Sequence, residues 1–281
     1  MPMGRSKKKA GKFASSQLPD LQTIESLLAV LGGRREDDAI DAAQEIIYDA
    51  WATGDRRKRV ALAKKALKLS PLCADAYVLL AQETTRHLDE TIDLYRQGVA
   101  AGEKALGKTC FRNDVGHFWS ILETRPYMRA RRGLAQALWD KGLRDDAVAH
   151  FSDMLRLNPN DNQGIRYLLI DCLLTLGCDD EAAALIKRYD EDGAAAWSWS
   201  RALLAFRRAG DRPQSRDALS QAMSDNKYIA PLLLGDRKMP RQLPDYISCG
   251  GKDEAVAYVY GTAGAWTVAA GALTWLRTRQ E

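Results

Sequence analysis

The chain has 281 residues, of which 46% are hydrophobic, so it can bury a core and is not disordered as a whole. Its 41 lysines and arginines nearly balance its 37 aspartates and glutamates. Five of the bases lie in residues 1–12, and without them 36 bases face 37 acids. This balance argues against a surface dedicated to nucleic acid, which needs a sustained excess of Lys and Arg on one face.

Residues 1–17 are predicted to be a basic disordered leader. No apolar stretch follows its charges, as a secretory signal peptide would require. The five cysteines are scattered without any Cys-x-x-Cys pair, which indicates free thiols rather than a zinc site or a disulfide framework. We therefore expect a cytoplasmic protein.

Residues 18–225 are predicted to be a series of helical hairpins, because one spacing of small and apolar residues recurs along them. In the unit that begins at Met128, a turn glycine stands at place 15, an alanine at 20, a phenylalanine at 24 and a proline at 32. The turn glycines Gly142, Gly177 and Gly210 then follow at steps of 35 and 33 residues. Small residues fit where two helices cross closely, and Gly or Pro ends a helix. The predicted units lie near 40–73, 74–107, 128–161, 163–195 and 196–227, with an irregular connection at 108–127.

Residues 226–281 break the repeat and are predicted to form a loop-rich wrap followed by capping helices, since the last apolar face of a solenoid has to be covered. Within them, residues 255–276 carry no charge over 22 residues, a length that would also span a membrane. This stretch holds three glycines, three threonines, two tyrosines and two tryptophans but only two leucines. We therefore favour a buried or capping helix pair, and a membrane contact stays open as the alternative.

The spacing of the repeat resembles the tetratricopeptide repeat, and four stretches narrow the likeness further. They are GHFWSILETRPYMRA, RLNPNDNQGIRYLL, AWSWSRALLAFR and the closing DEAVAYVYGTAGAWTVAAGALTWL. Over residues 42–276 the chain resembles bacterial tetratricopeptide proteins allied to the suppression-of-tumorigenicity-seven family. The resemblance implies an all-α solenoid of tetratricopeptide-type helical hairpins, with a C-terminal helical cap and no enzymatic activity. Related sequences carry charged residues in their closing helices. The uncharged helices here are therefore compatible with contact to an additional partner or to a membrane.

The resemblance also implies a concave groove, lined by places 2, 5, 9, 12 and 13 of each first helix. The predicted groove residues are Arg129, Arg132, Gln136, Trp139, Tyr167, Asp171, Trp197, Arg207 and Arg208, together with Asp140, Gly164, Leu174, Thr175, Ser200 and Leu204. Arginine guanidinium groups bind carboxylates in a bidentate manner, and aromatic side chains provide contact surface, so these residues favour a peptide that carries carboxylates. We therefore expect a non-enzymatic scaffold that binds an acidic peptide or protein segment. The alternative is that the arginines are a solvated face and that the tryptophans pack between repeats.

Place 4 of the unit, usually a core aromatic, is an arginine in two consecutive units, Arg131 and Arg166. Buried arginines need partners. An internal network with carboxylates is therefore expected at these positions, and Asp171 and Glu123 are the candidate partners.

Two other classes of function stay open. The first is nucleic-acid binding by the leader and the arginine-rich wall 125–132. The second is a metal-dependent enzyme around His117, which has Cys110, Asp114 and Glu123 nearby in the sequence. The chain contains no G-x-x-x-x-G-K-[ST], H-E-x-x-H or G-x-S-x-G motif. We therefore predict no catalytic residue, no metal and no cofactor.

Overall fold

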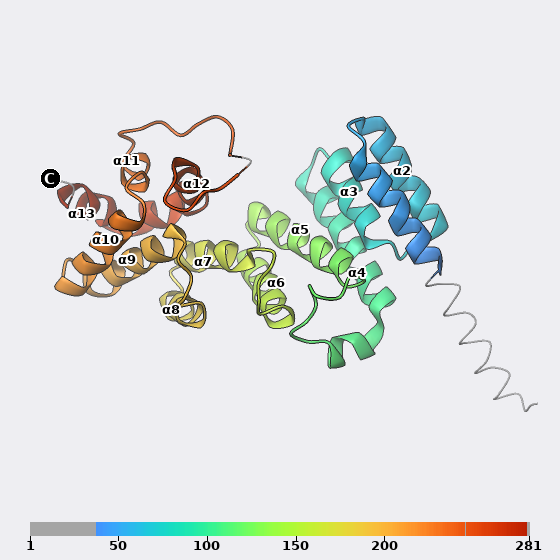
Figure 1. Cartoon of the computed structure of the whole chain (residues 1–281), viewed down its shortest axis with the longest axis horizontal. Helices are drawn as coiled ribbons and strands as arrows, with labels where there is room; N and C mark the ends of the chain where they lie inside the picture. Colours follow the sequence, from blue (N-terminus) through green and yellow to red (C-terminus); the bar gives the residue numbers. More distant parts are fainter. Residues whose placement is uncertain (1–37, 245, 280–281) are drawn as a thin grey trace, which may run out of the picture.

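The computed structural model describes residues 38–244 and 246–279, and every regular element in this part of the chain is a helix (Figure 1). The helices are the segment 38–52, α2 (Arg56–Leu69), α3 (Ala74–Thr84), α4 (Leu88–Asn113), α5 (Arg125–Lys141), α6 (Arg144–Leu157), α7 (Ile165–Leu176), α8 (Asp179–Arg188), α9 (Ala195–Ala209), α10 (Pro213–Asp225), α11 (Ile229–Leu233), α12 (Lys252–Val268) and α13 (Ala272–Thr278). Successive helices up to α10 pack as hairpins that stack along the chain. The predicted all-α fold of tetratricopeptide-type hairpins is confirmed. The predicted leader, residues 1–17, lies outside the described residues.

Glycines end the first helix of three hairpins, at Gly142, Gly177 and Gly210. Helices α5 and α7 stop at Gly142 and Gly177, whose φ angles of +88° and +78° lie in the left-handed region. Only glycine adopts this conformation without a steric cost. The backbone N–H of Gly142 donates to carbonyl groups in the last turn of α5, which satisfies acceptors that the helix itself leaves open. The glycines found in the sequence pattern therefore act as helix stops.

The irregular connection before α5 is shorter than the predicted 108–127. Helix α4 continues to Asn113, with a break at Gly107, and α5 begins at Arg125, so the connection comprises residues 114–124. Two of its backbone N–H groups, those of Gly116 and Phe118, donate to the carbonyl of Leu157 at 2.9 and 3.2 Å. The connection is thus tied to the end of α6.

The C-terminal segment covers the last hairpins. Helix α12 packs against α7 and α9, and its Tyr258 and Trp266 lie against Trp199 of α9 with ring centroids 6.3 and 5.9 Å away. The Trp266 Nε1–H donates to the Tyr258 hydroxyl at 2.9 Å. Burial of this cluster raises the pKa of Tyr258. The uncharged stretch 255–276 therefore belongs to capping helices.

Glu254 fixes the start of α12. Its side chain is buried, and it accepts hydrogen bonds from the backbone N–H of Ala195 at 2.9 Å, the side-chain amide of Asn226 at 2.9 Å and the backbone N–H of Gly250 at 2.7 Å. One carboxylate thus joins the starts of α9 and α12 to the end of α10. Within residues 38–244 and 246–279, no helix combines the length and the apolarity needed to cross a membrane.

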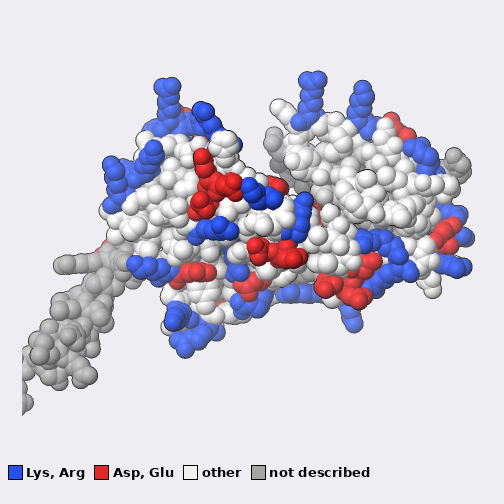
Figure 2. Space-filling view, turned by 180° about the vertical axis from the view of Figure 1, so that it is seen from behind, with Lys and Arg blue, Asp and Glu red and all other residues white. Residues whose placement is uncertain are grey.

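The surface carries both signs of charge. Figure 2 shows lysines and arginines interspersed with aspartates and glutamates over the hairpins, next to a broad uncharged area. This agrees with the balance of charge in the sequence outside residues 1–12.

Gly133 of α5 allows α4 and α5 to approach closely, because a Cβ there would overlap the ring of Tyr95. We expect Gly133→Ala to lower the free energy of unfolding by about 1–3 kcal/mol through overpacking. Gly264 of α12 is the matched control, since in the described part of the chain an added Cβ would have no atom within 4 Å other than its chain neighbours and its own helical backbone. Gly264→Ala should raise the free energy of unfolding by up to about 1 kcal/mol, because alanine favours the helix. Urea unfolding of both variants checks the opposite signs, and equal effects would contradict the close contact.

Candidate binding site

The chain's own helix α12 covers the groove face of α7 and α9. Gly261 of α12 lies so close to the Asp171 carboxylate that a Cβ would overlap it, and Ser200 of α9 is fully buried. Figure 1 shows α12 beside both helices. The predicted groove positions on α7 and α9 are therefore largely covered.

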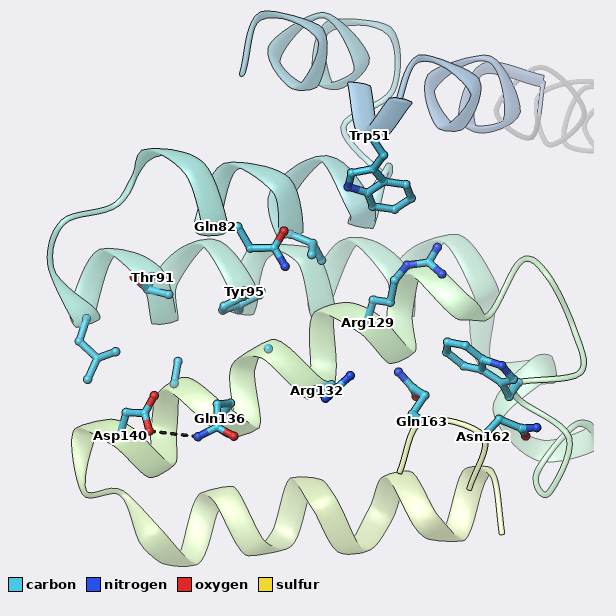
Figure 3. A pocket seen from close by; sticks show the side chains of 15 residues that line it. Trp51, Gln82, Thr91, Tyr95, Arg129, Arg132, Gln136, Asp140, Asn162 and Gln163 are labelled. Atoms are coloured by element: carbon cyan, nitrogen blue, oxygen red, sulfur yellow. Dashed lines mark hydrogen bonds between the residues drawn. The ribbon is translucent and has the colours of Figure 1, made fainter. Parts of the chain in front are cut away.

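An open pocket of about 720 Å³ lies over the N-terminal hairpins, between the segment 38–52, α3, α4, α5 and the loop before α7 (Figure 3). Its aromatic walls are Trp51, Tyr95 and Trp119. Burial raises the pKa of Tyr95, against the opposing effects of Gln82 and Arg132. The pocket thus has both aromatic and polar side chains in its wall, and the first helices of three hairpins contribute to it.

Four side-chain amides line this pocket, those of Gln82, Gln136, Asn162 and Gln163. An amide both donates and accepts hydrogen bonds, as a peptide backbone does. The Oε1 atom of Gln163 is buried and has no hydrogen-bond partner among the described residues. Gln136 donates to Asp140 at 3.0 Å, which holds the side chain along the pocket wall.

Arg129 lines the pocket but is already neutralised. Its guanidinium forms a bidentate ion pair with Asp75, which is 0% exposed, and the Nε to Oδ1 distance is 2.8 Å. Gln44 donates to the same carboxylate at 2.9 Å, and the Arg129 guanidinium carbon lies 5.2 Å from the Trp51 ring centroid. Arg129 is therefore a structural link between hairpins rather than a free cation.

Arg132, one helical turn further along α5, is exposed and has no ion-pair partner among the described residues. Figure 3 shows its side chain in the middle of the pocket, between Gln136 and Gln163. Among the four predicted groove arginines, it is the one whose charge the described part of the chain leaves uncompensated.

The other two predicted groove arginines bind the chain's own acids. Arg207 forms an ion pair with Asp179 at 2.9 Å and also donates to the carbonyl of Leu174. Arg208 forms an ion pair with Asp180 at 2.6 Å. These two arginines hold α9 to α8.

The predicted place of Trp197 in the groove is wrong. Its side chain is fully buried and packs edge-on against Tyr167 and Tyr189, with ring centroids 5.6 and 6.3 Å away. The hydroxyl of Tyr167 donates to Asp192 at 2.8 Å. Both aromatic residues therefore join α7 to the start of α9.

The expected internal network of Arg131 and Arg166 is present, but its proposed partners were wrong. Arg131 pairs with Asp153 and donates to the Tyr127 hydroxyl at 2.7 Å. Arg166 pairs with Asp161 at 3.0 Å and Asp192 at 2.6 Å. Each arginine takes its carboxylates from the same hairpin or the adjoining loops, where the distance along the chain is short.

A second hollow of about 440 Å³ adjoins the pocket between α5, α7 and α12. It contains four predicted groove residues, Gln136, Trp139, Asp140 and Asp171. The ring of Trp139 is stacked by Arg144, whose guanidinium carbon lies 3.9 Å from the ring centroid. Burial raises the pKa of Asp171 well above its usual range.

The cluster drawn around His117 does not assemble. Within the described ranges, no group of three or more His, Cys, Asp or Glu side chains could hold a metal ion. The backbone N–H of His117 donates to the carbonyl of Asp114 at 3.0 Å, which closes a turn in the connection.

Several pocket residues were not among the predicted groove residues, although they occupy the groove places of the first two repeat units. Trp51 is at place 12 of the unit that begins at Ile40. Val78 and Gln82 are at places 5 and 9 of the unit that begins at Ala74. Applying the groove places to the first two units would therefore have found this wall.

The stacked hairpins, with a pocket on their first helices, define an all-α helical-repeat protein. The family described as "ST7 protein" matches residues 34–281, and the chain belongs to this family. The predicted resemblance is therefore confirmed.

Similar proteins include a "Protein ST7 homolog" of Caenorhabditis elegans, 28% identical over 281 residues, which cover 85% of this chain and 51% of the relative. A "Suppressor of tumorigenicity 7 protein-like" of Gallus gallus is 25% identical over 268 residues, which cover 88% of this chain and 48% of the relative. The chain thus spans about half the length of the curated relatives it matches. Among solved structures, that of YrrB, "a TPR protein with an unusual peptide-binding site", is similar with a TM-score of 0.45 and 19% identity, covering 67% of this chain and 91% of that chain.

Proposed function

We propose that this chain is a non-enzymatic scaffold that holds an extended segment of a partner protein in the pocket around Arg132. The observation that supports this most is Arg132 itself, a cation without an ion-pair partner among the described residues, placed between side-chain amides. A carboxylate of the bound segment would form an ion pair with the Arg132 guanidinium. The amides suit the alternating donors and acceptors of a peptide backbone.

The aromatic walls support the same proposal. Trp51, Tyr95 and Trp119 offer large rigid faces, the residue type that carries much of the binding energy in protein interfaces. The lining residues include no serine, cysteine, histidine or lysine. The side-chain amides and aromatic faces that do line the pocket suit the recognition of a peptide.

Nucleic-acid binding has less support. Along the wall 125–132, Arg129 and Arg131 pair with aspartates, and Arg125 donates to the carbonyl of Trp119 at 2.9 Å. Acids and bases are mixed on the face that Figure 2 shows. The leader, which the alternative also needs, lies outside the described residues.

A positional-scanning library of immobilised peptides tests the proposal. We expect the unmodified protein to enrich peptides with an acidic group at one position. Arg132→Ala should weaken binding of those peptides about 10-fold to 100-fold, because a hydrogen bond to a charged group contributes roughly 1.5–3 kcal/mol.

Arg57→Ala is the matched control, since Arg57 is an exposed arginine of α2 that does not line the pocket. This control should bind as the unmodified protein does. Equal binding by Arg132→Ala and Arg57→Ala, or a library without any enriched peptide, would overturn the proposal.

A further inference from the structure

The hollow between α5, α7 and α12 continues the pocket rather than standing apart from it. Both are lined by Gln136 and Asp140 of α5, and the hollow adds Asp171 of α7 and Tyr260 of α12. An extended segment that leaves Arg132 along α5 therefore passes directly into the hollow.

The charge of the hollow is opposite to that at Arg132. Asp171 lies against Gly261 of α12 and has neither a hydrogen bond nor an ion pair among the described residues. Asp140 is exposed and accepts a hydrogen bond from Gln136. Two bases lie near this end of α5. Lys141 forms an ion pair with Asp89 at 2.8 Å, and Arg144 is stacked on Trp139 and donates to its carbonyl at 2.8 Å. The hollow thus holds two carboxyl groups whose charge no ion pair in the described part of the chain compensates.

We propose that this hollow is a second subsite of the same groove, which accepts the cationic group of a lysine or arginine side chain of the bound peptide. This inference rests on the proposed function. Asp171 and Asp140 would receive the cation, and the faces of Trp139 and Tyr260 would flank its aliphatic stem. Tyr260 is 70% exposed, so its ring is available for that contact. Burial raises the pKa of Asp171, and a cation would relieve the cost of ionising this carboxyl group.

The geometry of α5 sets the spacing that the peptide needs. Arg132 and Asp140 are two turns apart on one helix, which corresponds to about 12 Å at the rise of an α-helix. An extended peptide covers that distance in about four residues. The bound segment should therefore carry its acidic and basic residues about four positions apart.

The peptide library described above tests this subsite when Asp171→Asn and Asp140→Asn are screened beside the unmodified protein. The unmodified protein should enrich peptides with one acidic and one basic residue at the stated spacing. Asp171→Asn keeps the shape of the side chain and removes its charge, so it should lose the preference for the basic residue while keeping that for the acidic one. Replacement of the basic residue by norleucine should weaken binding to the unmodified protein about tenfold or more.

Two further variants make the outcome specific. Arg132→Ala should show the reverse loss, and Asp146→Asn, at an exposed aspartate of α6 outside the hollow, should keep both preferences. Enriched peptides with an acidic residue and no basic preference would overturn the subsite while leaving the proposed function intact. An unchanged basic preference in both Asp171→Asn and Asp140→Asn would overturn it too. A library without any enriched peptide would overturn the proposed function and this subsite together.

Discussion

Arg129→Ala should lower the free energy of unfolding by about 3–5 kcal/mol, because it leaves the buried carboxylate of Asp75 without its cation. Asp75 is 0% exposed and, among the described residues, would keep only Gln44 as a hydrogen-bond donor. The ion pair between Arg129 and Asp75 also joins α5 to α3, because both residues are at place 2 of their repeat units. Urea unfolding followed by circular dichroism measures the effect.

Arg132→Ala is the matched control, because Arg132 is exposed on the same helix and has no ion pair in the described residues. Its free energy of unfolding should stay within about 0.5 kcal/mol of the unmodified protein. Equal stability of the two variants would show that the pair with Asp75 adds nothing to the fold. Binding experiments should therefore use Arg132 variants, since a loss of binding in an Arg129 variant would reflect the fold.

Glu254→Ala should lower the free energy of unfolding by about 3 kcal/mol, because hydrogen bonds to a charged group each contribute roughly 1.5–3 kcal/mol and their losses are not additive. The change leaves the donors of Ala195, Asn226 and Gly250 without their carboxylate. It should also release the start of α12 from α9 and make residues 246–251 more accessible to protease. Urea unfolding and limited proteolysis measure the two effects.

Glu191→Ala at an exposed position is the control for this change and should behave as the unmodified protein does. A Glu254→Ala variant as stable and as resistant to protease as this control would contradict the role of Glu254 in holding the cap. Glu254→Gln should lie between the two, since it keeps one acceptor oxygen.

The hairpins could be predicted from the sequence because their signals are local. A turn glycine such as Gly142 fixes the end of one helix, and the small and large residues around it fix the crossing of the next. The length of the connection before α5 was harder to predict. Helix α4 resumes after Gly107, and the anchor of the connection is the carbonyl of Leu157, more than 30 residues away.

The candidate site could be predicted only in part, because contacts between distant parts of the chain decide which groove residues are covered or paired. The groove register places Arg132 and Gln136 in the pocket, because both lie on the open face of α5. It fails for Ser200, which is buried beneath the C-terminal segment. Nor could the pairing of Arg129 be predicted, since Asp75 comes from another unit 54 residues earlier. Which arginine remains free depends on such distant partners.

Photo-crosslinking would show where a bound segment lies on the protein. The probe is a peptide that the library enriches, with a photoreactive group next to its acidic residue. Mass spectrometry would locate the attached residues. We expect attachment to the pocket wall formed by α3, α5 and the loop before α7, near Gln82, Arg132 and Gln163, and a loss of attachment in Arg132→Ala. Attachment confined to α8, α10 or the outer surface of α2, with no change in Arg132→Ala, would show that the segment does not bind in the pocket around Arg132.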